Sequence, residues 1–252
     1  LRTFAWFGMI FFRFFSLALQ LAAFLFNLST NITLNGENFR ANVPLLDVGW
    51  TIVRDLANIC FIFILLFIAI STIIGNANYG AKKLLPKVII AAVLINFSAV
   101  IARVVIDISN LLALQFWSRF PGGDISTVLG EGLNPQRLLQ VSDNFTTGGA
   151  FQTLLNIFIS TIMGSIIVLV AACVLFAGII YFIIRLVALW FLIIFSPIAF
   201  IGSILPETKK YADEWWKKLF EQAFFAPAYL FFLYLVGKIV NDKFLARLTG
   251  TF

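Results

Sequence analysis

The sequence contains no histidine and few charged residues. Of its 252 residues, 12% are Asp, Glu, Lys or Arg, whereas 61% are hydrophobic. The lack of histidine excludes histidine-based acid–base catalysis, catalytic triads that use histidine, and zinc or haem sites with imidazole ligands. A typical soluble domain is about one quarter charged and about half apolar. The composition therefore predicts an integral membrane protein.

Cysteine is also scarce. Cys60 and Cys173 both lie inside apolar runs, so we interpret them as small buried hydrophobic side chains and not as a disulfide or a metal-binding pair. The sequence has no phosphate-binding loop, no pair of intramembrane aspartates and no serine–lysine pair in a plausible register. We therefore expect a protein that is not an enzyme, with no cofactor and no catalytic, cofactor-binding or metal-binding residues.

Long stretches without charge predict transmembrane helices. A helix of about 20 apolar residues crosses the hydrocarbon of a bilayer. Uninterrupted runs such as residues 56–74 exclude the alternating pattern of a β-barrel. The sequence thus predicts an all-α, polytopic helical membrane protein that forms a single membrane domain over residues 1–252. The expected spans, about six in number, lie near residues 4–27, 51–74, 88–117, 153–184, 186–204 and 220–240.

Two segments between the spans have a distinct composition. Residues 118–152 are rich in Gly, Ser, Thr, Asn and Asp, which predicts a long loop. Residues 206–218 combine two tryptophans with lysines, a composition that favours the headgroup layer of a membrane. We expect this segment to form an interfacial helix that contacts lipid. Its anchoring side chains are Lys209, Lys210, Trp215, Trp216, Lys217 and Lys218.

The lysines of one short loop indicate the orientation. The chain carries a net charge of +6, and Lys82, Lys83 and Lys87 lie close together between two expected spans. Because Lys and Arg collect in cytoplasmic loops, we expect this loop in the cytoplasm. The polar segments 28–50 and 118–152 are then expected outside.

Two topologies remain open after Arg185, which we expect at a cytoplasmic boundary. In the first, residues 186–204 form a full span, residues 206–218 lie outside, and the C-terminus is cytoplasmic. In the second, the chain turns back at Ser196-Pro197, so that the following lysines are cytoplasmic and the C-terminus lies outside. A helix kink is expected at Ser196 and Pro197. The length of 186–204 is sufficient for a span, which slightly favours the first topology.

Four polar residues share one face of the third expected span. With about 100° of rotation per residue, Arg103, Asp107 and Asn110 fall at roughly −20°, +20° and −40° from Asn96. Arg103 and Asp107 are spaced i, i+4 and are expected to pair. A charge at this depth is costly unless it is paired or hydrated. The stripe therefore indicates either an ion pair that fixes helix packing or the lining of a polar pathway or subunit interface.

The second span opens with Arg54, Asp55 and Asn58. In the expected topology these residues lie at its outer end. One interpretation is an interfacial anchor formed together with Trp50. The alternative is that they pair with the outer end of the polar stripe on the third span.

Three stretches carry a family resemblance. They are "GWTIVRDLANICFIFILLFIAISTIIGNANYGAKKLLPKVIIAAVLINFS" (49–98), "RLVALWFLIIFSPIAFIGSILPETKKYADEWWKKLF" (185–220) and "EQAFFAPAYLFFLYL" (221–235). The second runs from Arg through an apolar run, Ser-Pro, a further apolar run and Pro to a basic helix with Trp. Together they resemble the TrbL/VirB-six-like polytopic inner-membrane subunits of type IV secretion (conjugation) systems, in the version found in candidate-phyla bacteria.

The resemblance implies a non-enzymatic channel or scaffold component in the bacterial inner membrane, within a machine that moves DNA or protein across the envelope. It implies a homo-oligomer that contacts stalk or pilus-like subunits and works with a cytoplasmic ATPase. The cytoplasmic C-terminus usual in the family agrees with the first topology. Two other function classes remain open: a secondary transporter that uses the polar stripe, and a membrane enzyme, for which we find no nucleophile with a base.

Overall fold

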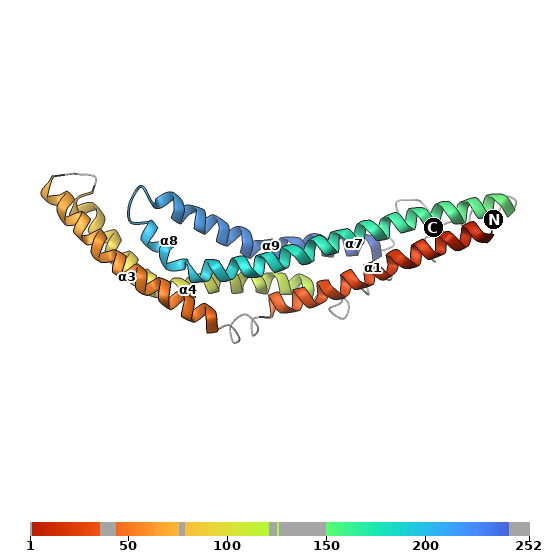
Figure 1. The fold of residues 1–252 in the computed structure, drawn as a ribbon, viewed down its shortest axis with the longest axis horizontal. Helices are drawn as coiled ribbons and strands as arrows, with labels where there is room; N and C mark the ends of the chain where they lie inside the picture. Colours follow the sequence, from red (N-terminus) through yellow and green to blue (C-terminus); the bar gives the residue numbers. More distant parts are fainter. Residues whose placement is uncertain (1, 36–43, 76–78, 121–124, 126–149, 242–252) are drawn as a thin grey trace. The chain divides into compact units, whose positions relative to one another are not determined.

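The computed structural model describes residues 2–35, 44–75, 79–120, 125 and 150–241, and all regular secondary structure within them is helical. In chain order, the helices are α1 (Arg2–Leu34), α3 (Pro44–Ile73), α4 (Ala81–Trp117), α7 (Ala150–Ile194), α8 (Ser196–Gly202) and α9 (Lys209–Asn241) (Figure 1). The prediction of an all-α polytopic membrane protein is confirmed.

Five of these helices are long and apolar enough to cross a membrane. Their candidate spans are Phe12–Leu34, Pro44–Ile73, Ala81–Trp117, Thr161–Ile194 and Lys209–Ile239. The first helix continues past the expected end at residue 27 into the Ser- and Thr-containing stretch that follows. The expected loop 118–152 lies mostly outside the described residues; α4 ends at Trp117 and α7 begins at Ala150.

The structure corrects the expectation of two separate spans at residues 153–184 and 186–204. The structure has one helix of 45 residues, α7, which passes through Arg185 and ends at Ile194. Arginine is a good helix former, so a single Arg does not interrupt a helix whose neighbours are apolar. The helix instead ends just before Ser196-Pro197, and the short helix α8 begins there with Pro197 in its first turn.

The break after α7 follows from the chemistry of proline. Pro197 has no N–H to donate to the carbonyl of Ile193, four residues earlier. The hydroxyl of Ser196 donates to that carbonyl instead, at 2.8 Å. The chain then bends into α8, which packs against α3. Residues 186–204 are therefore divided between the end of α7, α8 and a turn, and they do not form a span of their own.

The structure also corrects the expectation of a separate helix at residues 206–218. The structure has one continuous helix, α9, from Lys209 to Asn241. No Gly or Pro lies between Lys209 and Ala226, so nothing in the local sequence separates the Trp/Lys segment from the apolar segment that follows. Pro227 lies inside α9 and does not end it.

The described chain divides into two compact units. Unit 1 comprises Leu1–Ile32, Ala113–Ile183 and Ala228–Phe252, and unit 2 comprises Thr33–Leu112 and Ile184–Pro227. Each unit contains segments that are distant in sequence. Packing between these segments, and not chain order alone, therefore defines both units.

Unit 1 has an aromatic core around Phe26 of α1. Its ring centroid lies 5.6 Å from that of Phe182, 5.8 Å from that of Tyr229 and 6.0 Å from that of Trp117. Gly178 of α7 permits this packing, because a Cβ atom there would lie 2.4 Å from the Tyr229 hydroxyl oxygen. That hydroxyl donates to the carbonyl of Val174 at 3.0 Å.

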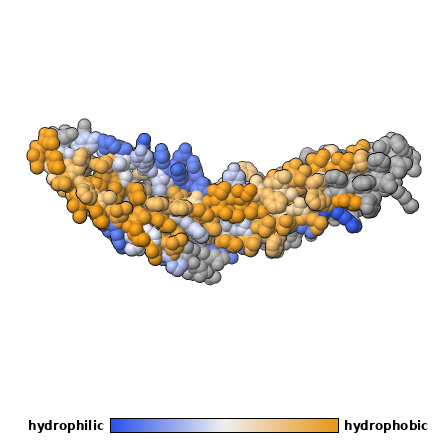
Figure 2. Space-filling model, in the orientation of Figure 1, coloured by the Kyte–Doolittle hydropathy of each residue, from blue (hydrophilic) through white to orange (hydrophobic). Residues whose placement is uncertain are grey.

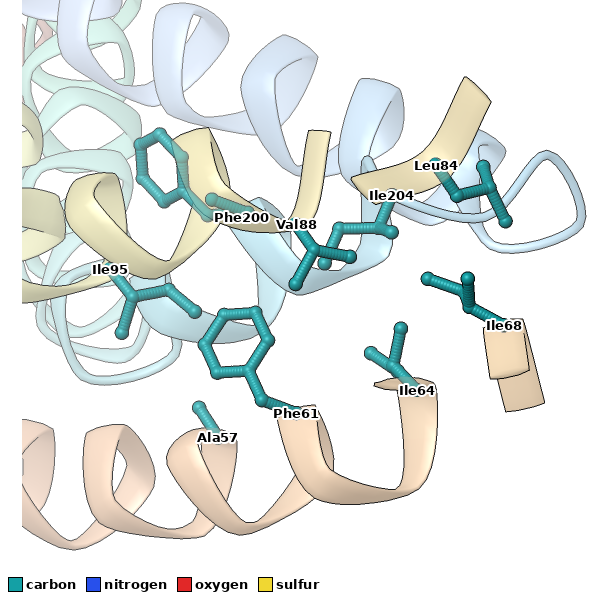
Figure 3. Packing of buried hydrophobic residues seen from close by; sticks show 10 residues of the cluster. Ala57, Phe61, Ile64, Ile68, Leu84, Val88, Ile95, Phe200 and Ile204 are labelled. Carbon is teal, nitrogen blue, oxygen red and sulfur yellow. The ribbon is translucent and has the colours of Figure 1, made fainter. Parts of the chain in front are cut away.

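Unit 2 is built on the α3–α4 hairpin, with α8 packed into it. Figure 3 shows the side chains of this cluster, which come from α3, α4 and the segment of α8 and the turn after it. They are Ala57, Phe61, Ile64, Ile68, Leu84, Val88, Ala91, Ile95, Phe200 and Ile204. In lipid, helices associate mainly through close van der Waals packing and hydrogen bonds between helices. This interdigitation therefore holds the reversal of the chain at α8 in place.

Candidate functional site

The most unusual side chain of unit 2 is Arg185 of α7. It is the largest of the fully buried residues, with 0% of its surface exposed. The burial of Arg185 was not expected from the sequence, and its expected place at a cytoplasmic boundary stays a prediction. An arginine this deeply buried needs other groups to satisfy most of its donors, because an unpaired buried charge is very costly.

Three hydrogen bonds connect Arg185 to two other helices. Nη2 donates to Oδ1 of Asn110 on α4 at 2.7 Å. Nε donates to the carbonyl of Gln222 on α9 at 2.9 Å, and Nη2 also lies 3.3 Å from the carbonyl of Ala223. A single guanidinium thus joins α7, α4 and α9, using the several donors that Arg presents in a fixed geometry.

Pro227 explains why the backbone carbonyl of Ala223 on α9 is available to Arg185. A proline inside a helix cannot donate to the carbonyl four residues earlier, which here is that of Ala223. The Ser109 hydroxyl and Arg185 both donate to this carbonyl. The buried arginine and serine therefore replace the hydrogen bond that the proline removes.

One donor group of Arg185 has no partner among the described residues. Nη1 of Arg185 is buried and makes no hydrogen bond within the described residues. The cluster consists of Ser109, Asn110, Arg185, Gln222 and Ala223, and we call it the arginine cluster. Sequence reasoning missed it, although two signals were present: a lone Arg in a long apolar run, and a Pro inside an apolar helix.

Residues of the polar stripe on α4 bond to different partners. Asn110 is buried and accepts from Arg185. Arg103 forms an ion pair with Asp47 in the first turn of α3, a partner that the i, i+4 spacing to Asp107 did not predict. Asn96 is exposed, and its side-chain amide donates to the carbonyl of Ala92 on the same helix at 3.0 Å. Asp107 is half-buried. Asn110 and Arg103 thus join α4 to other helices, whereas Asn96 bonds within α4.

The charged residues near the start of α3 stay close to one another. Arg54 pairs with the adjacent Asp55 at 2.8 Å and lies over the ring of Trp50, 4.9 Å from its centroid. Asn58 is exposed. The indole N–H of Trp50 donates to Ser98 of α4 at 2.9 Å. Arg54 therefore stacks on a tryptophan that is itself fixed to α4, an arrangement that a cation–π contact stabilises.

The expected membrane anchors of residues 206–218 divide into two groups. Trp215 donates to the carbonyl of Leu192 at 3.2 Å, and the ring of Trp216 lies 5.9 Å from that of Phe200. Both tryptophans are half-buried and pack on the end of α7 and on α8. The four lysines are exposed: Lys209, Lys210, Lys217 and Lys218.

A contact between two turns places the basic segments at one end of unit 2. The hydroxyl of Tyr79, just before α4, donates to the carboxylate of Glu207, just before α9. This hydrogen bond lowers the pKa of Glu207 and raises the pKa of Tyr79. Lys82 and Lys83 in the first turn of α4 therefore lie at the same end of the unit as the first turn of α9.

These features define a multi-pass helical membrane protein. Its buried residues Ser109, Asn110 and Arg185 join helices, and its exposed side chains include many large apolar ones on every long helix. Comparison of the chain with protein-family models, with curated proteins and with solved structures finds no match.

Proposed function

We propose that the chain is a non-enzymatic channel or scaffold subunit of a type IV secretion-like machine, which moves DNA or protein across the envelope from the bacterial inner membrane. The observation that carries the proposal is the use of polar side chains to join helices. Arg185 and Asn110 hold α7, α4 and α9 together, and Arg103 with Asp47 holds α4 to α3. Such contacts favour a structural role over a substrate site formed by the α4 stripe.

The outward surfaces of the helices also support a subunit role. Large apolar side chains are exposed along α3, as at Ile62, Phe63 and Leu66, and along α4, as at Ile89 and Ile90. In a membrane such surfaces contact lipid or the helices of other subunits. The proposal therefore includes a homo-oligomer surrounded by lipid, in contact with stalk or pilus-like subunits and a cytoplasmic ATPase.

Affinity purification from native membranes, with native mass spectrometry, tests this function. We expect a particle with several copies of the chain, and we expect mild cross-linking to capture stalk-like subunits and an ATPase. A particle with one copy that moves a small solute across proteoliposomes would contradict the proposal and favour a secondary transporter.

The variant Asp107→Asn separates the two functions at one residue of the stripe. If the stripe holds helices together, oligomers should weaken in detergent. If it binds a transported solute, uptake should be lost while the oligomer persists. Arg54→Gln serves as the matched control, because Arg54 pairs with an exposed neighbour in sequence. Unchanged behaviour of Asp107→Asn in both assays would exclude both roles for this residue.

A further inference from the structure

The first four turns of α9 carry a dense group of exposed charges. All seven charged side chains between Lys209 and Glu221 are exposed. They are Lys209, Lys210, Asp213, Glu214, Lys217, Lys218 and Glu221, and we call their surface the charged face of α9. Lys217 and Glu221 lie 3.7 Å apart, and their side chains remain 74% and 55% exposed. An ion pair this open is typical of a helix surface in contact with water.

Contacts at both ends fix this segment beside the α3–α4 hairpin. Before α9 begins, Glu207 accepts the hydrogen bond from Tyr79 at the end of the hairpin. Further along α9, Leu219 is buried in a cluster with Leu46 of α3 and Ala102 of α4. Between these points, Trp216 packs against the cluster that α8 forms with the hairpin. The charged face therefore runs alongside the hairpin, at depths between Tyr79 and Ala102.

Beyond Lys82, Lys83 and Lys87, which are exposed in the first two turns of α4, the hairpin has the properties of a membrane-crossing element. Residues 56–74 contain no charge and, as a helix, extend for about 28 Å, close to the thickness of the hydrocarbon layer. Side chains on its outer surface, such as Ile62, Leu66 and Ile70, are exposed. The space-filling view shows hydrophobic residues over α3 and hydrophilic residues over the beginning of α9 (Figure 2).

These observations place an apolar surface, suited to lipid, and a charged surface, suited to water, at the same depth of unit 2. Charged side chains within a membrane face the interior of an assembly or a water-filled space, because contact with hydrocarbon is costly. We propose that the charged face of α9 lines a water-filled passage that begins beside the first lysines of α4 and continues to the depth of the hydrocarbon layer, closed by other copies of the chain.

The composition of the charged face indicates what the passage admits. Four lysines alternate with three acidic residues, so neither sign of charge dominates. Such a lining suits water, small ions of both signs and hydrophilic cargo, and it does not select strongly by charge. This inference rests on the proposed channel function for its closure by other copies, but not for its contact with water.

Spin-label accessibility in liposomes tests the passage. In a background of Cys60→Ala and Cys173→Ala, labels are attached at Asp213→Cys and Lys217→Cys, and at the matched controls Ile62→Cys and Leu66→Cys on the hairpin. We expect the first two labels to collide more often with a water-soluble nickel chelate than with oxygen. The hairpin labels should show the reverse ratio and a depth inside the hydrocarbon.

Two outcomes would overturn the passage. If the labels on α9 prefer oxygen, the charged face does not contact water. If the hairpin labels prefer the nickel chelate, unit 2 does not lie at hydrocarbon depth. Dipolar coupling between labels at Lys217→Cys of different copies tests the closure, and its absence overturns that part. A single-copy particle with the expected accessibility ratios contradicts the secretion-subunit function while leaving the contact with water intact.

Discussion

At the scale of single residues, Arg185 shows how a charge is accommodated in an apolar helix. Its guanidinium donates to one side-chain oxygen and two backbone carbonyls, which come from two different helices. One of these carbonyls lacks its helical donor because of Pro227. The buried charge and the intrahelical proline therefore complement each other, and each is expected to be tolerated less well alone.

We expect Arg185→Met to destabilise the protein by about 2–3 kcal/mol, because it leaves the buried Asn110 oxygen without its donor and removes the hydrogen bonds to two carbonyls of α9. The measurement is the free energy of unfolding in detergent or bicelles. Arg54→Met is the matched control and should cost about 1 kcal/mol or less, since Arg54 forms a surface ion pair with the adjacent, exposed Asp55. Equal effects of the two variants would contradict a structural role for the arginine cluster.

A double-mutant cycle with Pro227→Ala tests the link between the proline and the arginine. Alanine restores the N–H that can donate to the carbonyl of Ala223, so this acceptor of Arg185 regains its helical donor. We expect Arg185→Met to cost about 1 kcal/mol less in the Pro227→Ala background than in the native chain. Additive effects would show that the two residues act independently.

A second residue-scale prediction concerns Gly178. An alanine there would place its Cβ 2.4 Å from the Tyr229 hydroxyl oxygen and 3.0 Å from a ring carbon of Phe26. We expect Gly178→Ala to lower the free energy of unfolding by about 1–3 kcal/mol through overpacking. Gly202→Ala is the control, because a Cβ there finds ordinary contacts of 3.4 Å or more. A greater loss of stability at Gly202 than at Gly178 would refute this explanation.

At the scale of helices and turns, two features reverse the chain between α7 and α9. The first is the local stop at Pro197, where Ser196 takes over a backbone acceptor. The second is tertiary: Phe200 and Ile204 pack into the α3–α4 hairpin, and Tyr79 donates to Glu207. A proline alone does not end a helix, because α9 continues through Pro227. The packing of α8 is therefore what turns a kink into a reversal.

The Tyr79–Glu207 contact predicts a dependence on pH. Its hydrogen bond lowers the pKa of Glu207 from the ordinary value of 4.5, so the ionised carboxylate is stabilised in the folded chain. The contribution is complete above pH 4.5 and is lost as the pH falls through the lowered pKa. Tyr79→Phe removes the donor and should return the pKa of Glu207 toward its ordinary value.

Melting temperatures of the native chain and of Tyr79→Phe, compared across the acid range, provide the measurement. We expect the native chain to be the more stable near neutral pH and the difference to close in acid. Glu207→Gln should abolish the dependence of the difference on pH. A difference that is constant down to the lowest pH would show that the carboxylate is not the partner that matters.

At the scale of the whole molecule, the contact between the two turns bears on membrane topology. It places the lysines that begin α4 and those that begin α9 at one end of unit 2. Lysines at one end predict a common side of the membrane, and the positive-inside rule indicates the cytoplasmic side. This arrangement favours the topology in which the chain turns back after Ser196-Pro197.

We therefore expect Lys83→Cys and Lys210→Cys to react with a membrane-impermeant thiol reagent from the same side. The experiment uses sealed vesicles of both orientations, in a chain whose two native cysteines are replaced by alanine. Both positions should be protected in right-side-out vesicles and labelled in inverted ones. Labelling of the two positions from opposite sides would restore the topology in which residues 186–204 cross the membrane.

Much of the fold could be predicted from local sequence. The excess of apolar residues and the long runs without charge determine membrane-crossing helices, because isolated backbone polar groups must be satisfied within the hydrocarbon. The helices α3, α4 and the last part of α9 were therefore predictable to within several residues. The end of α7 was also marked in the sequence, by Ser196-Pro197, although the charge of Arg185 suggested an earlier boundary.

The sequence by itself determined that this is an all-α, multi-pass membrane protein, because composition and hydrophobic run length act locally along the chain. Only the tertiary structure decided which polar groups meet. Asn110 bonds to Arg185 and Arg103 to Asp47, through contacts between residues that are far apart in sequence. It also joined the end of α7, α8 and α9 to the α3–α4 hairpin. The physical reason is that a buried charge requires partners in three dimensions, and helical periodicity specifies a face but not the helix that covers it.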